Sequence, residues 1–193
     1  MRLIGTAASA FLFAAIMASS ASAVTVWNSI PDPNAISWVA TDGSGSKIDG
    51  TCAKFNSDIS FDPDDLGHSH VRVEIDMASC QTGEVQKDTY LPQQPWFDIA
   101  TFPVAVFQAK SFKHEGGDKY VANGELTLKG VSMPIVLPFT LDRQGDTAHV
   151  TGETVVNRLN FGVGSGDMAS AQVAGPNVTI KIDLKAKSAG ASQ

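Results

Sequence analysis

Apolar residues recur at every second position in short segments of this chain, and this period limits the fold more than any other feature. In residues 71–77 the odd-numbered positions are all apolar, and positions 72, 74 and 76 are all charged. Side chains of a β-strand point alternately to opposite faces, so such a segment is a strand with one dry face. The same alternation recurs in residues 59–61, 125–129, 135–141 and 178–184.

Turn-forming residues separate these segments at short intervals. They occur as Asp62-Pro63-Asp64-Asp65, Glu115-Gly116-Gly117-Asp118, Lys129-Gly130 and Gln144-Gly145-Asp146. Connections this short join antiparallel neighbours. We therefore expect eight strands, with residues 84–99 irregular or briefly helical. The expected strands are 35–41, 47–61, 70–80, 103–113, 118–129, 133–142, 147–157 and 177–187.

Eight antiparallel strands with one apolar face each predict an all-β fold, a closed up-and-down barrel. A sandwich of two sheets is the alternative. Closure removes exposed strand edges, and an eight-stranded barrel is either filled by its own side chains or holds one small ligand.

The first 23 residues have the pattern of a secretory signal peptide. Arg2 gives a positive start, residues 3–17 are largely apolar, and Ala21-Ser22-Ala23 is a small-residue cleavage site. The apolar run is short for a membrane-spanning helix, so we expect cleavage after Ala23 and a soluble, periplasmic protein. An uncleaved anchor is the alternative. The expected division is a signal peptide (1–23), one barrel domain (24–187) and a flexible C-terminal tail (188–193).

The charge of the mature chain argues against some partners. Arg2 is the only charged residue in the expected signal peptide, so its removal lowers the net charge from −6 to −7. An acidic chain of this kind does not favour nucleic acid or anionic headgroups through a broad basic surface.

The two cysteines, Cys52 and Cys80, are expected to form one disulfide, because an exported protein folds under oxidising conditions. Two free thiols, or half of a metal site, are the alternatives. If the strands that carry them form a hairpin, opposed residue numbers have a constant sum. Ile59 with Val73 gives 132, and so does Cys52 with Cys80.

Both cysteines nevertheless break the alternation of odd-numbered apolar residues on their strands. A shared kink or bulge near residues 53–54 and 78–79 would account for this. The equal sums still favour a cross-strand disulfide.

Three groups of residues, spread in order over the expected mature chain, carry a family pattern. They are Gly50-x-x-x-x-Phe55 with Ile59-x-Phe61-Asp62-Pro63, Tyr120-x-Ala122-x-Gly124-x-Leu126-Thr127-Leu128-Lys129-Gly130-Val131, and Arg158-x-Asn160-Phe161-Gly162. In these motifs the chain resembles the YceI-like family of periplasmic polyisoprenoid-binding proteins. The resemblance implies a lipocalin-like barrel whose apolar tunnel holds a polyprenyl chain, such as a quinone tail or a polyprenyl phosphate.

The chain departs from the family pattern in three places. Cys52 and Cys80 stand where the family usually has bulky apolar residues, and Asn160 replaces the usual Asp. The strand at 35–41 lacks the His that some members carry shortly after it. These departures leave the fold unchanged but put the headgroup preference in doubt.

An apolar tunnel would match such a cargo energetically. Each five-carbon isoprene unit removed from water is worth roughly 3–4 kcal/mol, at about 0.8 kcal/mol per carbon group. A solid core filled by the same side chains is the alternative. The residues expected to line the tunnel are Val73, Ile75, Phe107, Leu126, Leu128, Leu137, Phe139, Phe161, Ile180 and Ile182.

Four further residues are expected at a mouth of the barrel. Trp96 and Phe97 lie in the irregular segment, where they would form either a movable cap or a permanent plug. Arg158, with Asn160 beside it, is the candidate for the headgroup, because a guanidinium grips phosphate or carbonyl oxygens. The alternative for Arg158 is a structural ion pair with Asp88 or another carboxylate.

The sequence shows no catalytic motif of the common kinds: no Gly-x-Ser-x-Gly, no phosphate-binding loop and no dinucleotide fingerprint. His68 and His70 would need Asp62, Asp64 or Asp65 to hold a metal, and a solvated hairpin loop is the favoured interpretation. We therefore predict a carrier of a bound isoprenoid lipid and not an enzyme, with no catalytic residue, no metal and no covalent cofactor.

Two other functions stay open at this point. The second hypothesis is an accessory protein of a membrane quinone or redox system, and the third is an enzyme that modifies isoprenoids. Besides the isoprenoid itself, a membrane redox protein and a second copy in a homodimer are the partners considered, and nucleic acid is not expected.

Overall fold

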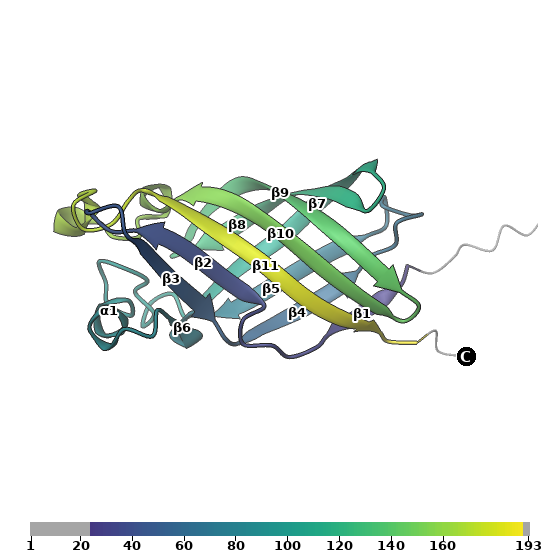
Figure 1. The fold of residues 1–193 in the computed structure, drawn as a ribbon, viewed down its shortest axis with the longest axis horizontal. Coiled ribbons are helices and arrows are strands. Elements are labelled where there is room, and N and C mark those ends of the chain that lie inside the picture. The colour runs from purple at the N-terminus through teal and green to yellow at the C-terminus, as the bar shows by residue number, and fades with distance from the viewer. Residues whose placement is uncertain (1–23, 191–193) are drawn as a thin grey trace, which may run out of the picture.

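Antiparallel strands close into one barrel in the computed structural model, which describes residues 24–190 (Figure 1). The strands of this part of the chain are β1 (Val26–Ser29), β2 (Ile36–Thr41), β3 (Lys47–Cys52), β4 (Phe55–Ser60), β5 (His70–Asp76), β6 (Cys80–Gln81), β7 (Val104–Gly116), β8 (Lys119–Leu128), β9 (Val131–Gln144), β10 (Thr147–Asn157) and β11 (Asn177–Ser188). The helices are α1 (Val85–Tyr90) and the 3-10 helices η1 (Met77–Ser79), η2 (Arg158–Phe161) and η3 (Gly166–Ala169).

These eleven segments make up the eight strands of an up-and-down barrel. The first three barrel strands are each interrupted, so each consists of two segments. β1 and β2 are two parts of the first strand, β3 and β4 of the second, and β5 and β6 of the third. Every strand pairs with its neighbour in the sequence, and the first strand closes the ring on β11. β11 pairs with β2 at Ile36–Ile182 and with β1 at Trp27–Ser188. The predicted barrel is confirmed, and the sandwich is not observed.

Both ends of the chain extend the sheet further than the sequence predicted. Residues 26–29 form β1 ahead of the strand expected at 35–41. The sequence did not predict that the first strand begins this early, because the stretch between β1 and β2 is irregular. At the other end of the described chain, Ser188, expected to be the first residue of the tail, belongs to β11, and the Ala189 N–H donates a backbone hydrogen bond to the Val26 carbonyl. The expected signal peptide lies outside the described residues.

Two long connections, and not one, depart from the sheet. Residues 84–99 hold α1 and a series of turns, as expected, but residues 158–176 form a second irregular segment that contains η2 and η3. Among residues 24–190 no helix is both long and apolar enough to cross a membrane.

The register between the second and third strands changes along the hairpin. Cys52 faces Cys80, so the sum of 132 is correct there, but β4 and β5 pair as Phe55 with Ile75, with a sum of 130. The predicted register is therefore wrong by two residues in β4 and β5. The cause is the turn that contains η1: four residues, 76–79, separate Ile75 from Cys80, whereas only residues 53 and 54 separate their partners Phe55 and Cys52.

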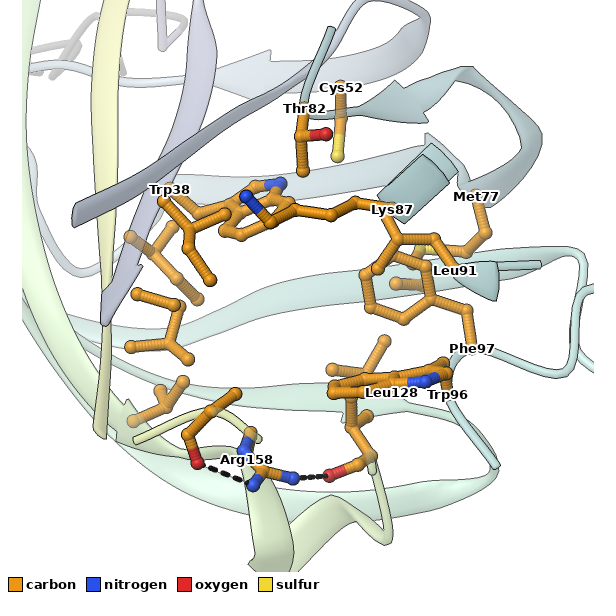
Figure 2. Close-up of a pocket in the computed structure, with 18 of the residues that line it drawn as sticks. Trp38, Cys52, Met77, Thr82, Lys87, Leu91, Trp96, Phe97, Leu128 and Arg158 are labelled. Atoms are coloured by element: carbon orange, nitrogen blue, oxygen red, sulfur yellow. Dashed lines mark hydrogen bonds between the residues drawn. The ribbon is translucent and has the colours of Figure 1, made fainter. Parts of the chain in front are cut away.

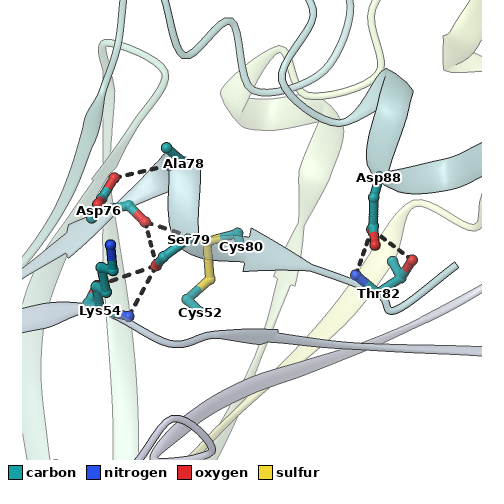
Figure 3. Close-up of a disulfide and its surroundings, with 8 residues drawn as sticks. All are labelled: Cys52, Lys54, Asp76, Ala78, Ser79, Cys80, Thr82 and Asp88. Atoms are coloured by element: carbon teal, nitrogen blue, oxygen red, sulfur yellow. Dashed lines mark hydrogen bonds between the residues drawn. A yellow bond between two sulfur atoms is a disulfide. The ribbon is translucent and has the colours of Figure 1, made fainter. Parts of the chain in front are cut away.

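The predicted kink is present and is built from local hydrogen bonds (Figure 3). Asp76 caps η1 by accepting from the Ala78 N–H at 3.0 Å, and the Ser79 hydroxyl donates to the Asp76 carbonyl at 2.7 Å. The Lys54 N–H, on the facing strand, donates to the Ser79 hydroxyl at 3.0 Å. Cys52 and Cys80 form the disulfide immediately beyond this kink, with their Cα atoms 4.0 Å apart. The predicted disulfide is confirmed.

The alternating strand directions give the barrel two different ends. We call one the α1 end: it carries α1, the β2–β3 turn, the β8–β9 turn and the segment 158–176 (Figure 1). The opposite end, which we call the aromatic end, carries the β4–β5, β7–β8 and β9–β10 turns and the described termini. Its core is a cluster of T-shaped and stacked rings in which Phe61 contacts Phe112, Tyr120 and Phe139.

Candidate functional site

The interior of the barrel holds two adjoining cavities. The larger, of about 470 Å³, lies toward the α1 end, and the smaller, of about 160 Å³, lies toward the aromatic end. Ile36, Ile75, Leu126 and Ile180 line both, so they form the waist between the two. The larger volume falls within the roughly 300–1,000 Å³ of small-molecule sites.

Inward-facing strand residues make both walls apolar. β11 contributes Ile180 and Ile182, and β8 contributes Leu126, because alternate residues of a strand face the same side. At its far end the smaller cavity meets Phe61, Phe112 and Phe139 of the aromatic cluster. The barrel thus encloses an elongated apolar space with an aromatic floor.

Nine of the ten residues predicted to line a tunnel do line these cavities. Phe161 does not: it is buried in η2 and packs against Leu126, Val156 and Val163 behind the cavity wall. The nine are Val73, Ile75, Phe107, Leu126, Leu128, Leu137, Phe139, Ile180 and Ile182.

Apart from Trp96, Phe97 and Arg158, the sequence did not identify the residues of the larger cavity that surround its mouth. One side of α1 and its C-cap face the cavity with Gln86, Lys87, Tyr90 and Leu91. Their spacing of three to four residues is typical of one helix face, and it is the sequence signal from which they could have been predicted. Val85, on the other face of this helix, is 85% exposed. Met168 and Val173 reach the cavity from the segment 158–176, where no period marks them.

The two predicted aromatic residues lie in the mouth wall of the larger cavity (Figure 2). Their segment is tied to the rest of the mouth, since Gly164 N–H and Ser165 N–H both donate to the Pro95 carbonyl, at 2.7 and 2.9 Å. The Lys129 ammonium adds a second tie by donating to the Gln94 and Gly162 carbonyls. Burial lowers the pKa of this lysine.

Arg158 is 4% exposed, and its guanidinium is enclosed by the chain (Figure 2). Its Nε–H donates to Gly175, one terminal nitrogen donates to Val163 and Gly164, and the other donates to Met168 and Ala174. These bonds to backbone carbonyls are 2.7–3.2 Å long. A guanidinium has five N–H donors, so this set accounts for all of them. Burial lowers the pKa of Arg158.

Both interpretations of Arg158 from the sequence are therefore corrected. Its donors hold the segment 158–176 in place, which leaves none for a headgroup. The alternative, an ion pair with Asp88 or another carboxylate, is also wrong, because the partners of Arg158 are carbonyls. Asp88 accepts from the Thr82 N–H and hydroxyl (Figure 3) and from the Gly83 N–H. Asn160 is exposed and lines neither cavity, because η2 turns Arg158 and Phe161 inward and Asn160 outward.

The cavity walls are poor in groups that perform chemistry. Neither wall contains Asp, Glu or His, and the ionisable groups of the larger one are Lys87, Tyr90 and Arg158. The Lys87 ammonium pairs with Glu84. Within the described part of the chain, no cluster of three or more His, Cys, Asp or Glu residues could hold a metal ion.

Comparison with solved structures finds the same barrel in other bacteria. BcnA of Burkholderia cenocepacia superposes with a TM-score of 0.74 at 29% identity, over 78% of this chain and 94% of BcnA. A polyisoprenoid binding domain from Saccharophagus degradans gives 0.66 at 16% identity, over 86% and 99%. At that identity the likeness shows the fold alone.

Comparison with protein sequences gives the family. A UPF0312 protein of Photorhabdus laumondii is 33% identical over 144 residues, which cover 74% of this chain and 73% of that protein. Protein YceI of Salmonella newport is 35% identical over 103 residues, 53% of each chain. The family model for the YceI-like domain matches residues 27–186. This chain therefore belongs to the YceI-like family.

Proposed function

We propose that this protein binds a long-chain polyisoprenoid lipid, of the quinone or polyprenyl phosphate type, inside its barrel and carries it through the periplasm. The observation that supports this most is the pair of adjoining apolar cavities, which share a waist and end on aromatic rings. Their elongated shape suits one flexible hydrocarbon chain. The similar fold of a domain named for polyisoprenoid binding supports the same proposal.

The chemistry of the walls favours binding over catalysis. An isoprenoid-modifying enzyme needs an acid, a base or a metal close to the reacting atoms. The walls hold no carboxylate or imidazole, and their ammonium and guanidinium are already paired. An accessory role in a membrane quinone or redox system would use the same cavity, so the identity of the bound lipid distinguishes it from simple carriage.

Export is part of the proposal. The pattern of residues 1–23 supports it, and so does a disulfide, since disulfides persist in oxidising compartments. The intact mass of the protein from its native host tests this, because cleavage after Ala23 leaves Val24 as the first residue.

Leu126→Trp tests the cavity as the binding site. Leu126 is buried at the waist, so a larger ring there would fill the passage and exclude the end of a long chain from the smaller cavity. We expect the affinity for a long isoprenoid to fall at least about tenfold, because half an isoprene unit left outside already loses about 1.5–2 kcal/mol. Titration of delipidated protein with long and short isoprenoids measures this, and a ten-carbon isoprenoid is expected to bind nearly unchanged.

Val136→Trp is the matched control. Val136 lies on the neighbouring strand β9 but faces outward and is 54% exposed, so the same added ring leaves the cavity unchanged. A folded Leu126→Trp protein that binds the long chain as tightly as the Val136→Trp protein would show that the chain does not pass the waist.

A further inference from the structure

The two ends of the barrel differ in the exposed apolar side chains that they carry. Ten large hydrophobic residues are exposed among residues 24–190, and seven of them lie at or next to the α1 end (Figure 1). The three turns of the aromatic end contain none of the ten. Exposed apolar surface of the described chain is therefore concentrated around one end. The seven residues are Val85, Tyr90, Val104, Val131, Val155, Leu159 and Val173.

The segments that carry these residues are joined to one another around the mouth of the larger cavity. The bonds to the Pro95 carbonyl hold the segment 158–176 against the connection that contains α1, and Lys129 ties both to the β8–β9 turn. On the other side of the mouth, the Gly175 N–H donates to the Thr41 carbonyl at 2.7 Å, which joins the same segment to β2. We call this continuous surface the rim.

The apolar wall of the larger cavity continues onto the rim. Tyr90 and Val173 line the cavity and are also 52% and 39% exposed. Val85 and Leu159 lie further out, because they are exposed and line neither cavity. An apolar surface therefore leads from the inside of the barrel to the outside of the protein.

The cargo indicates what such a rim meets. Each isoprene unit that leaves a bilayer for water lowers the equilibrium constant by roughly two to three powers of ten. A long isoprenoid therefore needs a path into the barrel on which its chain is not exposed to water. Exposed apolar patches of soluble proteins mark contacts with proteins or membranes, and the bilayer is the phase in which an isoprenoid dissolves.

The distribution of charge favours the same orientation. The turns of the aromatic end and their flanking residues contain seven carboxylates and three Lys or Arg residues, over residues 62–69, 113–119 and 142–146. The connections of the α1 end contain five carboxylates and three Lys or Arg residues, over residues 42–46, 82–103, 129–130 and 158–176. Because the aromatic end is the more negative, an anionic bilayer repels the α1 end less.

We propose that the rim docks on the surface of a lipid bilayer, so that the mouth of the larger cavity faces the membrane and exchanges the isoprenoid with it directly. This inference rests on the proposed function and adds the surface through which the lipid enters. The rim has no basic patch, so docking depends on apolar side chains that enter the bilayer surface. Vesicles of zwitterionic phosphatidylcholine are therefore sufficient to test it.

The experiment measures how fast delipidated protein takes an isoprenoid out of such vesicles. The probe is the tighter-binding of two lipids with six isoprene units each, a ubiquinone and a polyprenyl phosphate. Vesicles are removed by sedimentation at successive times, and the lipid left with the protein is quantified by mass spectrometry. Wild-type protein is expected to load at a rate that rises with the vesicle concentration, because loading requires contact.

Val85→Asp combined with Leu159→Asp places two charges on the rim and leaves both cavity walls unchanged. We expect the initial rate of loading to fall at least about tenfold, since burying one such apolar side chain is already worth about that factor. The amount of probe bound at equilibrium is expected to stay at the wild-type value.

Val26→Asp combined with Ile30→Asp is the matched control. These residues are 47% and 44% exposed, line neither cavity, and lie on or directly after β1, away from the rim. The control is expected to load at the wild-type rate. Melting curves of both double variants verify that they are folded.

The possible failures are distinct. If the rim variant loads as fast as the wild type, or if the control variant slows equally, docking through the rim is overturned while isoprenoid binding stands. Loading that begins only when a membrane protein is built into the vesicles would assign the rim to a protein partner and would also overturn the inference. If wild-type protein binds neither probe, even when the lipid is added directly from ethanol, the proposed function fails and this inference fails with it.

Discussion

Arg158→Met is expected to lower the free energy of unfolding by roughly 3–5 kcal/mol, because several buried backbone carbonyls lose the charged donor to which they are bonded. Methionine keeps the length of the side chain but removes all the donors that bind the carbonyls of the segment 158–176. Those carbonyls then lack their partner, at about 1–3 kcal/mol for each one that water cannot reach. For a domain of this size the midpoint of thermal unfolding should fall by roughly 6–20 °C.

Thermal melts followed by circular dichroism measure this effect, with Arg143→Met as the control. Arg143 is exposed on β9 and lies over the Trp27 ring at 5.5 Å, so its loss should cost only about 0.5–1 kcal/mol. If Arg158→Met melts like the wild type and instead loses affinity for an anionic polyprenyl lipid, Arg158 holds the headgroup and its structural role is refuted.

Replacing both Cys52 and Cys80 by alanine is expected to destabilise the barrel by about 3–4 kcal/mol, because the disulfide closes a loop with a sequence separation of 28. The hydrogen bonds of β3, β4, β5 and β6 remain, so the variant should fold and melt roughly 10 °C lower. The bond joins β3 and β6 immediately beyond the kink where the register changes, and Cys52 also lines the larger cavity.

Thiol counting on the unfolded, unreduced wild type accompanies these melts. No free thiol is expected from the disulfide-bonded protein, and reductant should reproduce the lower melting temperature of the double variant. Two free thiols in exported material, or equal melting with and without reductant, would contradict the stabilising disulfide.

The fold could be predicted from the sequence because the period of two recurs along the chain. In residues 71–77 and 178–184 it identified which face of each strand is dry, and short turns fixed antiparallel neighbours. The register of β4 and β5 could not be predicted, because the hydrogen bonds that place η1 in the third strand have no periodic signature. The slip is two residues, so every side chain kept its predicted face.

The site could be predicted only where strands build it. Ile75, Leu126 and Ile180 followed from alternation and lie at the waist. The rest of the mouth comes from α1 and the segment 158–176, which have no strand alternation. The arginine in this segment suggested a site for an anionic headgroup, but Arg158 donates its hydrogen bonds to backbone carbonyls of the same segment.

The most direct test of isoprenoid binding is mass spectrometry of the organic extract from protein purified out of its native host. One isoprenoid per barrel is the predicted result, with a chain long enough to span both cavities. A redox-active quinone would favour the link to a membrane redox system. Protein that yields no isoprenoid, and whose empty barrel takes up no added long-chain isoprenoid, would contradict the account.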